Sequence, residues 1–178
     1  GIVEEIAPAD VRTMLNVQES VSALFNDIDA DISVSGVGSN ALINNWDFTS
    51  GLAAINSAMS SGVFTTTAAL AGKYVVIVKV QYKQNGLTEG TRNHKLQILN
   101  YRNDGGGTPE DGTLVSFARV MNANYFNGYI LETTAVIDLA DTDTFGVYAK
   151  IAVSSGSGTW KIASGSNAMT SLTMIKIA

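Results

Sequence analysis

The segment Lys73–Lys83 constrains the fold more than any other part of this chain, because it is apolar on both sides of an extended strand. Side chains alternate between the two faces of a strand, so one face carries only apolar residues: Tyr74, Val76, Val78, Val80 and Tyr82. The other face is also apolar around Val75 and Ile77. In an antiparallel protein, the second cover of such a strand often comes from another subunit. The segment therefore predicts a β-sandwich that associates.

From Val34 onward, Gly, Ser, Asn and Thr separate short apolar stretches, a pattern typical of an antiparallel sandwich or barrel. No clearly helical segment interrupts them. We expect strands at Ala41–Phe48, Leu52–Met59, Gly62–Leu70, Lys73–Lys83, Asn93–Tyr101, Leu114–Met121, Gly128–Leu139, Phe145–Val153, Gly158–Ala163 and Ser171–Ile177.

The N-terminal segment is richer in acids and has a helical periodicity. Pro8 suits the first position of a helix, so a short helix is expected at Pro8–Asn16. An apolar stripe with helical spacing follows, made of Val17, Val21, Leu24 and Ile28. A helix this short is marginal in water, so it would lie on its own domain or join partner helices in a coiled-coil collar. We therefore expect a helical segment at 1–35 and a β-domain at 36–178.

Composition excludes several classes of partner. The net charge is −5 and Lys and Arg are sparse, which argues against binding to nucleic acid. The chain has no cysteine, so a disulfide framework and a thiolate metal site are both excluded. The longest apolar run is far shorter than a membrane span, so no membrane insertion is expected. Only 15% of the residues are charged, which suits a protein that buries surface between subunits.

Residues that could carry out catalysis are few. His94 is the only histidine, and it is expected on the surface at the start of a strand. Acids occur in three clusters: Asp27/Asp29/Asp31, Asp104/Glu110/Asp111 and Asp138/Asp141/Asp143. The first lacks the Gly and the closing Glu of a calcium loop, and the third contains turn positions at which Asp is common for backbone reasons. We predict no enzyme activity, no cofactor and no metal site, with calcium at the third cluster as the alternative.

Two loops are candidates for binding. Asn103–Gly112 contains three acids and several glycines, and is expected to be the most flexible part of the chain. Asn122–Gly128 carries Tyr125 and Phe126, which would either fold back over the core or present an aromatic binding surface. Trp46 and Trp160 carry the same ambiguity, although Trp46 lies in an expected strand and fits the core better.

Three short motifs follow one another: Ile55-Asn56-Ser57, Ser61-Gly62-Val63-Phe64-Thr65 and Ala71-Gly72-Lys73-Tyr74. Together with the apolar strands that end the chain, they resemble the tumour-necrosis-factor/complement-globular-head superfamily over roughly residues 40–178. Ser61 stands where that family usually has Thr, and Ala71 stands where Pro is common.

This resemblance implies an all-β jelly roll of two antiparallel sheets that trimerises, with one sheet of each subunit facing a threefold axis. A trimer would cover the second face of Lys73–Lys83. The residues expected at the trimer interface are Val17, Val21, Leu24, Ile28, Val75 and Ile77.

The N-terminal sequence resembles a segment of bacteriophage tail-fibre and related virion proteins that precedes the distal domain. The matching residues are Ala9, Val11, Arg12, Leu15 and Val17, whereas Pro8 departs from the pattern. The order of stalk and then knob implies a virion appendage.

The sequence therefore predicts a homotrimeric phage fibre or spike knob that adheres to its host through several weak sites at once. Expected partners are other virion proteins, bound through the N-terminal segment, and a host cell-surface glycan or protein. The receptor-binding candidates are Asn124, Tyr125, Phe126, Asp104 and Glu110. The main alternative is a capsid decoration or cement protein. A polysaccharide depolymerase is a third reading, which the absence of a repetitive β-helix disfavours.

Overall fold

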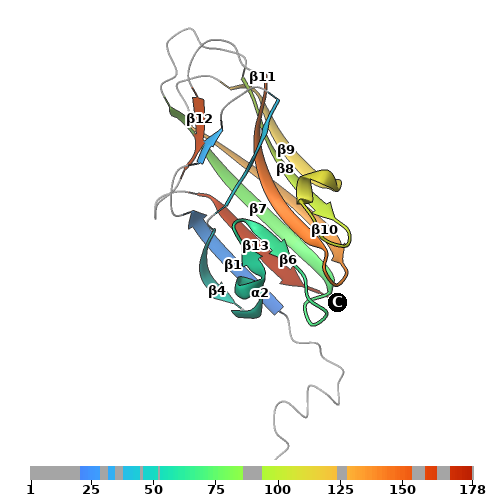
Figure 1. Ribbon diagram of the computed structural model, residues 1–178. Helices are drawn as coiled ribbons and strands as arrows, with labels where there is room; N and C mark the ends of the chain where they lie inside the picture. Colours follow the sequence, from blue (N-terminus) through green and yellow to red (C-terminus); the bar gives the residue numbers. More distant parts are fainter. Residues whose placement is uncertain are drawn as a thin grey trace, which may run out of the picture.

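The computed structural model describes residues 21–28, 32–34, 38–44, 46–51, 53–85, 94–123, 128–153, 159–163 and 169–177. They form two antiparallel sheets that pack face to face as a jelly-roll sandwich (Figure 1). This confirms the predicted fold class for the β-domain. The expected helix at Pro8–Asn16 lies outside the described residues.

The larger sheet, sheet A, has seven strands. Its members are β1 (Val21–Ile28), β2 (Ile32–Val34), β4 (Trp46–Gly51), β7 (Gly72–Asn85), β10 (Tyr129–Leu139), β12 (Thr159–Ile162) and β13 (Ser171–Lys176). Strand β7 pairs with β10 on one side, and with β13 and then β12 on the other. The predicted central strand is thus central, and it extends from Gly72 to Asn85.

The second sheet, sheet B, has six strands. Its members are β3 (Asn40–Leu42), β5 (Met59–Ser60), β6 (Val63–Thr65), β8 (His94–Asn103), β9 (Thr113–Ala123) and β11 (Thr144–Val153). A short helix α2 (Ala53–Ala58) precedes β5, and a 3₁₀ turn η1 (Pro109–Asp111) lies between β8 and β9. Strand β11 pairs with β8 on one side, and with β6 and β3 on the other.

The inner face of β7 forms the centre of the core. Its five predicted apolar side chains all have no exposed surface: Tyr74, Val76, Val78, Val80 and Tyr82. Opposite them, sheet B contributes buried residues such as Phe64, Leu96 and Ile98. The two tryptophans, Trp46 and Trp160, also lie in the core. Both tryptophans therefore pack in the core and do not form an aromatic binding surface.

Two tyrosines of β7 make buried polar contacts, and one of them joins the two sheets. The Tyr82 hydroxyl donates to the Gln97 carbonyl on β8 at 2.5 Å and accepts from the Lys150 amide on β11 at 3.1 Å. The Tyr74 hydroxyl donates to the Leu70 carbonyl at 2.5 Å. Burial raises the pKa of Tyr74 to about 12. Burial also raises the pKa of Tyr82, although the bond from the Lys150 amide opposes this.

The turn Ser61–Gly62 explains part of the central motif of the sequence. It joins β5 to β6, and both residues have positive φ angles of 48° and 82°. Two consecutive positive φ angles define the hairpin turn that matches the twist of the strands. A Cβ atom at Gly62 would lie 2.4 Å from the Ile43 carbonyl oxygen, so no larger residue fits there.

The predicted helical stripe is wrong over residues 21–28. These residues form β1, which pairs with both β13 and β4. Helical spacing in a short segment is a weak signal. Here pairing with two strands satisfies the backbone hydrogen bonds, whereas a lone helix of this length would be only marginally stable. Strands β1 and β2 therefore belong to the same sheet as the strands that follow residue 35.

The strand expected at Leu52–Met59 is also wrong, because α2 occupies most of it. Three alanines favour the helix, and Ile55 is its buried residue. The strand expected at Gly62–Leu70 is confirmed only as β6, since residues 68–70 form a turn.

We predict that the protein loses stability at alkaline pH through these two tyrosines. Because their folded pKa values lie above the unfolded value near 10, the stabilisation is complete below pH 10. It is lost as pH rises through the folded values, and for Tyr74 that window runs from 10 to about 12. Urea unfolding at a series of pH values should show this fall, and Tyr74→Phe should make it shallower. A fall of equal slope in the variant would contradict the assignment.

Candidate functional site

The outer face of sheet A has an apolar centre. At its centre, the register places Val136, Val75 and Ile175 side by side on β10, β7 and β13. Val136 is 63% exposed, and Ile130 and Ile177 are 48% and 49% exposed. Exposed apolar residues that gather on one face mark an interaction surface more often than scattered ones do. We call this surface the sheet A face.

The next row of the sheet A face includes Ile77, a predicted interface residue. Leu24 on β1 and Ile77 on β7 are both register partners of Thr173 on β13. At the next row, Lys79 and Glu132 form an ion pair at 3.4 Å. An apolar centre with a charged pair beside it resembles the core and rim of a protein interface.

The predicted interface residues are brought together only in part. Val75 and Ile77 lie on the sheet A face, half-buried within the single chain. Val21, Leu24 and Ile28 lie on β1 of the same sheet, whereas Val17 lies outside the described residues. The structure distinguishes the two faces of β7, which the sequence does not. Tyr74 and its companions meet sheet B, and Val75 and Ile77 point away from it.

The loop Asn103–Gly112 is anchored more firmly than the sequence suggested. Its Gly105 amide donates to Asp143 Oδ1 at 2.8 Å, and its Gly107 carbonyl accepts from the Thr144 hydroxyl at 2.9 Å. Within the loop, the Asn103 side chain donates to the Thr108 carbonyl at 2.9 Å. These bonds join the loop to the turn between β10 and β11.

Both acidic receptor candidates of this loop have partners in the chain. Asp104 is an exposed carboxylate that pairs with the Arg102 guanidinium. Glu110 accepts from the Asn40 side chain at 2.5 Å. The remaining candidates, Asn124, Tyr125 and Phe126, lie outside the described residues.

The third acidic cluster serves the fold. Asp143 is only 3% exposed, and its second oxygen accepts from the Ala140 amide at 2.9 Å. Arg102 Nε lies 4.0 Å from the same oxygen. In the described parts of the chain, no three His, Cys, Asp or Glu side chains gather in a way that could hold a metal ion.

The outer face of sheet B carries an aromatic cluster that sequence reasoning missed. Tyr101 and Tyr148 pack edge to face with ring centroids 5.6 Å apart. Pro109 lies beside Tyr148, since a Cβ atom at Gly146 would lie 3.1 Å from the Pro109 Cγ atom and 3.2 Å from Tyr148 Cε2. Burial raises the pKa of Tyr148, the backbone of nearby Glu110 lowers it, and the Glu110 carboxylate raises it. Alternation along Leu99-Asn100-Tyr101 would place the two apolar residues inside and Asn100 outside, whereas Asn100 is the fully buried residue, so the sequence held no signal for this cluster.

One side of the sandwich ends in two long edge strands. Of the described strands, β9 pairs only with β8, and β10 pairs only with β7. Strand β9 also carries three exposed apolar side chains, Leu114, Phe117 and Met121. Uncovered edges of this length invite pairing or contact with another chain.

No helix among the described residues has the length and apolar character of a membrane span.

Comparison with known proteins places the fold and leaves the family open. No family model matches the chain, and no curated protein matches it. Among solved structures, a murine APRIL structure at pH 5.0 has a TM-score of 0.61 at 9% identity, covering 89% of this chain and 100% of that one.

Two further solved structures have the same architecture. The globular domain of zebrafish complement 1qA protein has a TM-score of 0.57 at 12% identity, covering 90% of this chain and 98% of that one. Eiger TNF from S. frugiperda has a TM-score of 0.54 at 11% identity, covering 90% and 94%. The chain therefore has the jelly-roll fold of TNF and complement globular domains, as its motifs implied.

We predict that Asp143→Ala lowers the free energy of unfolding by about 1–3 kcal/mol, because two backbone amides lose their buried acceptor. Urea unfolding at a fixed protein concentration measures the loss. Asp141→Ala is the matched control, since Asp141 is an exposed acid of the same turn. Equal effects of the two substitutions would show that Asp143 does not anchor the loop.

Proposed function

We propose that this protein is a homotrimeric adhesion module, the knob of a bacteriophage fibre or spike. The observation that carries the trimer is the sheet A face, where Val136, Val75 and Ile175 form an apolar row across three strands. Contact with another copy would remove this row from water, at a gain of roughly 25 cal/mol per Å² of apolar surface.

A threefold ring needs two different surfaces that fit each other, whereas a twofold dimer uses one surface twice. The chain offers two such surfaces: the sheet A face, and the edge of that sheet at β10, which pairs only with β7 among the described strands. Packing the edge of one copy against the sheet A face of the next would cover both. This arrangement favours a closed ring and leaves much of the outer face of sheet B in solvent.

The place in a virion is supported by the N-terminal resemblance to phage tail-fibre proteins, carried by Ala9, Val11, Arg12, Leu15 and Val17. In this proposal, the N-terminal segment attaches the trimer to other virion proteins, and the jelly roll faces outward. Three equal sites would then raise the effective affinity for a host surface even when each site is weak. Capsid decoration is the alternative, using the same trimer to clamp coat subunits.

We predict that Val136→Asp converts the trimer to a monomer. Val136 is 63% exposed in the single chain, so the substitution should change folding stability by no more than about 0.5 kcal/mol. In a trimer it would bury an unpaired carboxylate. Light scattering at micromolar concentration, with circular dichroism to check folding, measures the result.

Thr65→Asp is the control for this experiment, because it adds the same charge at an exposed position of sheet B. A wild-type protein that is monomeric at this concentration would remove the trimer proposal. A Val136→Asp protein that remains trimeric would instead move the interface away from the sheet A face.

Adhesion and decoration predict different targets for the purified trimer. An adhesion module should bind host cells and leave empty capsids unoccupied, and a decoration protein should do the reverse. A pull-down with each particle, quantified by gel densitometry, separates the two functions. Binding to capsids alone would overturn the adhesion proposal.

A further inference from the structure

The outer face of sheet B carries three cations around one amide side chain. Gln97 on β8 has Lys150 of β11 as its register partner on one side and Arg119 of β9 on the other. Lys95 lies two residues earlier on β8, and therefore on the same face as Gln97. We call these four residues the basic cluster.

The cations of the basic cluster are close together. Side chains directly opposite each other on neighbouring strands have Cβ atoms about 5 Å apart, and positions two residues apart on a strand are separated by about 7 Å. Lys150 and Arg119 lie on opposite sides of Gln97, two strand spacings or roughly 10 Å apart, and like charges at that distance still repel each other weakly. In the part of the chain that the structure describes, no ion pair or side-chain hydrogen bond offsets the charges of Lys95, Arg119 and Lys150.

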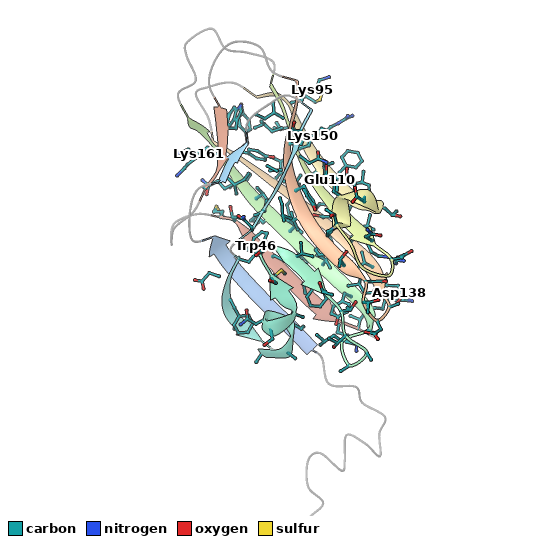
Figure 2. All side chains as sticks on the ribbon, viewed as in Figure 1. Trp46, Lys95, Glu110, Asp138, Lys150 and Lys161 are labelled. Atoms are coloured by element: carbon teal, nitrogen blue, oxygen red, sulfur yellow. The ribbon has the colours of Figure 1, made fainter. Side chains whose placement is uncertain are left out.

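Acids outnumber Lys and Arg in this chain by 16 to 11, yet none of the described acids pairs with a cation of the basic cluster. Asp138 and Asp143 lie at the opposite end of the sandwich. There Arg102 donates a hydrogen bond to the Asp138 carbonyl and lies near the Asp143 carboxylate. Figure 2 shows Lys95 and Lys150 toward the upper end, and Asp138 at the lower end. Glu110 is held by Asn40, the register partner of Lys150, and forms no ion pair with that lysine.

The backbone beneath the basic cluster is fixed from inside the core. The Tyr82 hydroxyl lies between the Gln97 carbonyl and the Lys150 amide, bonding both. Tyr82 itself is fully buried and packs edge to face against Trp160. The two strands that present Gln97 and Lys150 are thus held at a set separation, and a rigid scaffold lowers the entropic cost of binding.

Apolar surface adjoins the cations. Arg119 lies between Phe117 and Met121 on the same face of β9, and these two side chains are 51% and 45% exposed. The site therefore combines three positive charges, an amide that can both donate and accept, and an exposed aromatic ring. A saccharide that carries acidic groups has matching chemistry, with anionic groups, hydroxyls and an apolar ring face.

We propose that the basic cluster binds an acidic saccharide. Lys95, Arg119 and Lys150 pair with its anionic groups, and Gln97 forms hydrogen bonds with its hydroxyls. The role of this saccharide as the ligand of an adhesion module rests on the proposed function. Nucleic acid fits less well, because a protein with a net charge of −5 repels an extended phosphate backbone.

Calorimetry with short oligosaccharides measures the affinity of a single site, because a short ligand cannot reach two sites of a trimer at once. Oligogalacturonate supplies carboxylates, a phosphorylated mannan fragment supplies phosphates, and neutral dextran is the control. We expect at least one acidic probe to bind, more weakly as sodium chloride increases, because salt screens exposed charges. Binding of neither acidic probe, or equal binding of dextran, would overturn the proposal. So would tighter binding of a single-stranded DNA oligonucleotide.

Three single substitutions locate the site: Lys95→Gln, Arg119→Gln and Lys150→Gln. Each should weaken binding about tenfold, since a hydrogen bond to a charged group contributes about 1.5–3 kcal/mol. Lys176→Gln is the matched control, because Lys176 lies on β13 of the other sheet. Equal losses in the control would show that only the net charge matters.

Host-cell binding by the same variants separates this inference from the proposed function. If the oligosaccharide binds and the trimer does not adhere to cells, the site stands and the adhesion role fails. If the trimer adheres to cells and the three substitutions change nothing, adhesion stands and the basic cluster is not its site.

Discussion

The buried face of β7 is the constraint on which the rest of the sandwich depends. Its five inward side chains are fully covered, and the strand pairs with β10, β12 and β13. The core side chains of both sheets pack against this strand, so it determines where the other strands lie. Tyr82 adds a directional element, since its hydroxyl bonds β8 and β11 of the opposite sheet. Apolar burial supplies the stability, and this polar bridge sets the register between the sheets.

The two outer faces differ in chemistry, and in the proposed function this difference would separate assembly from binding. The sheet A face is apolar at its centre, around Val75 and Val136, which suits contact with another copy. The outer face of sheet B is divided into an aromatic cluster beside η1 and the basic cluster at its other end. A molecule that buries the first face in a trimer keeps the second for ligands. Because jelly rolls host many functions, these surfaces carry the functional argument and the fold does not.

Much of the fold could be predicted from alternation alone. The long strands β7, β10 and β11 were expected with nearly the bounds that they have, because each alternates over ten residues or more. The errors fell on short elements. Residues 53–58 form α2, and residues 21–28 form β1, since short patterns are ambiguous and pairing across the molecule decides them. The candidate site was predicted less well: Asp104 and Glu110 proved to be engaged within the chain, and the basic cluster was missed.

The sequence by itself determined that Tyr74, Val76, Val78, Val80 and Tyr82 share one face, that Val75 and Ile77 share the other, and that the chain forms an all-β sandwich. These conclusions follow from the two-residue period of a strand, which is a local property. Only the tertiary structure decided which face meets the opposite sheet and which cations meet across strands. Gln97, Arg119 and Lys150 are far apart in the sequence, and the register of three strands brings them together. Register depends on turns and packing throughout the molecule, so a single stretch of residues does not encode it.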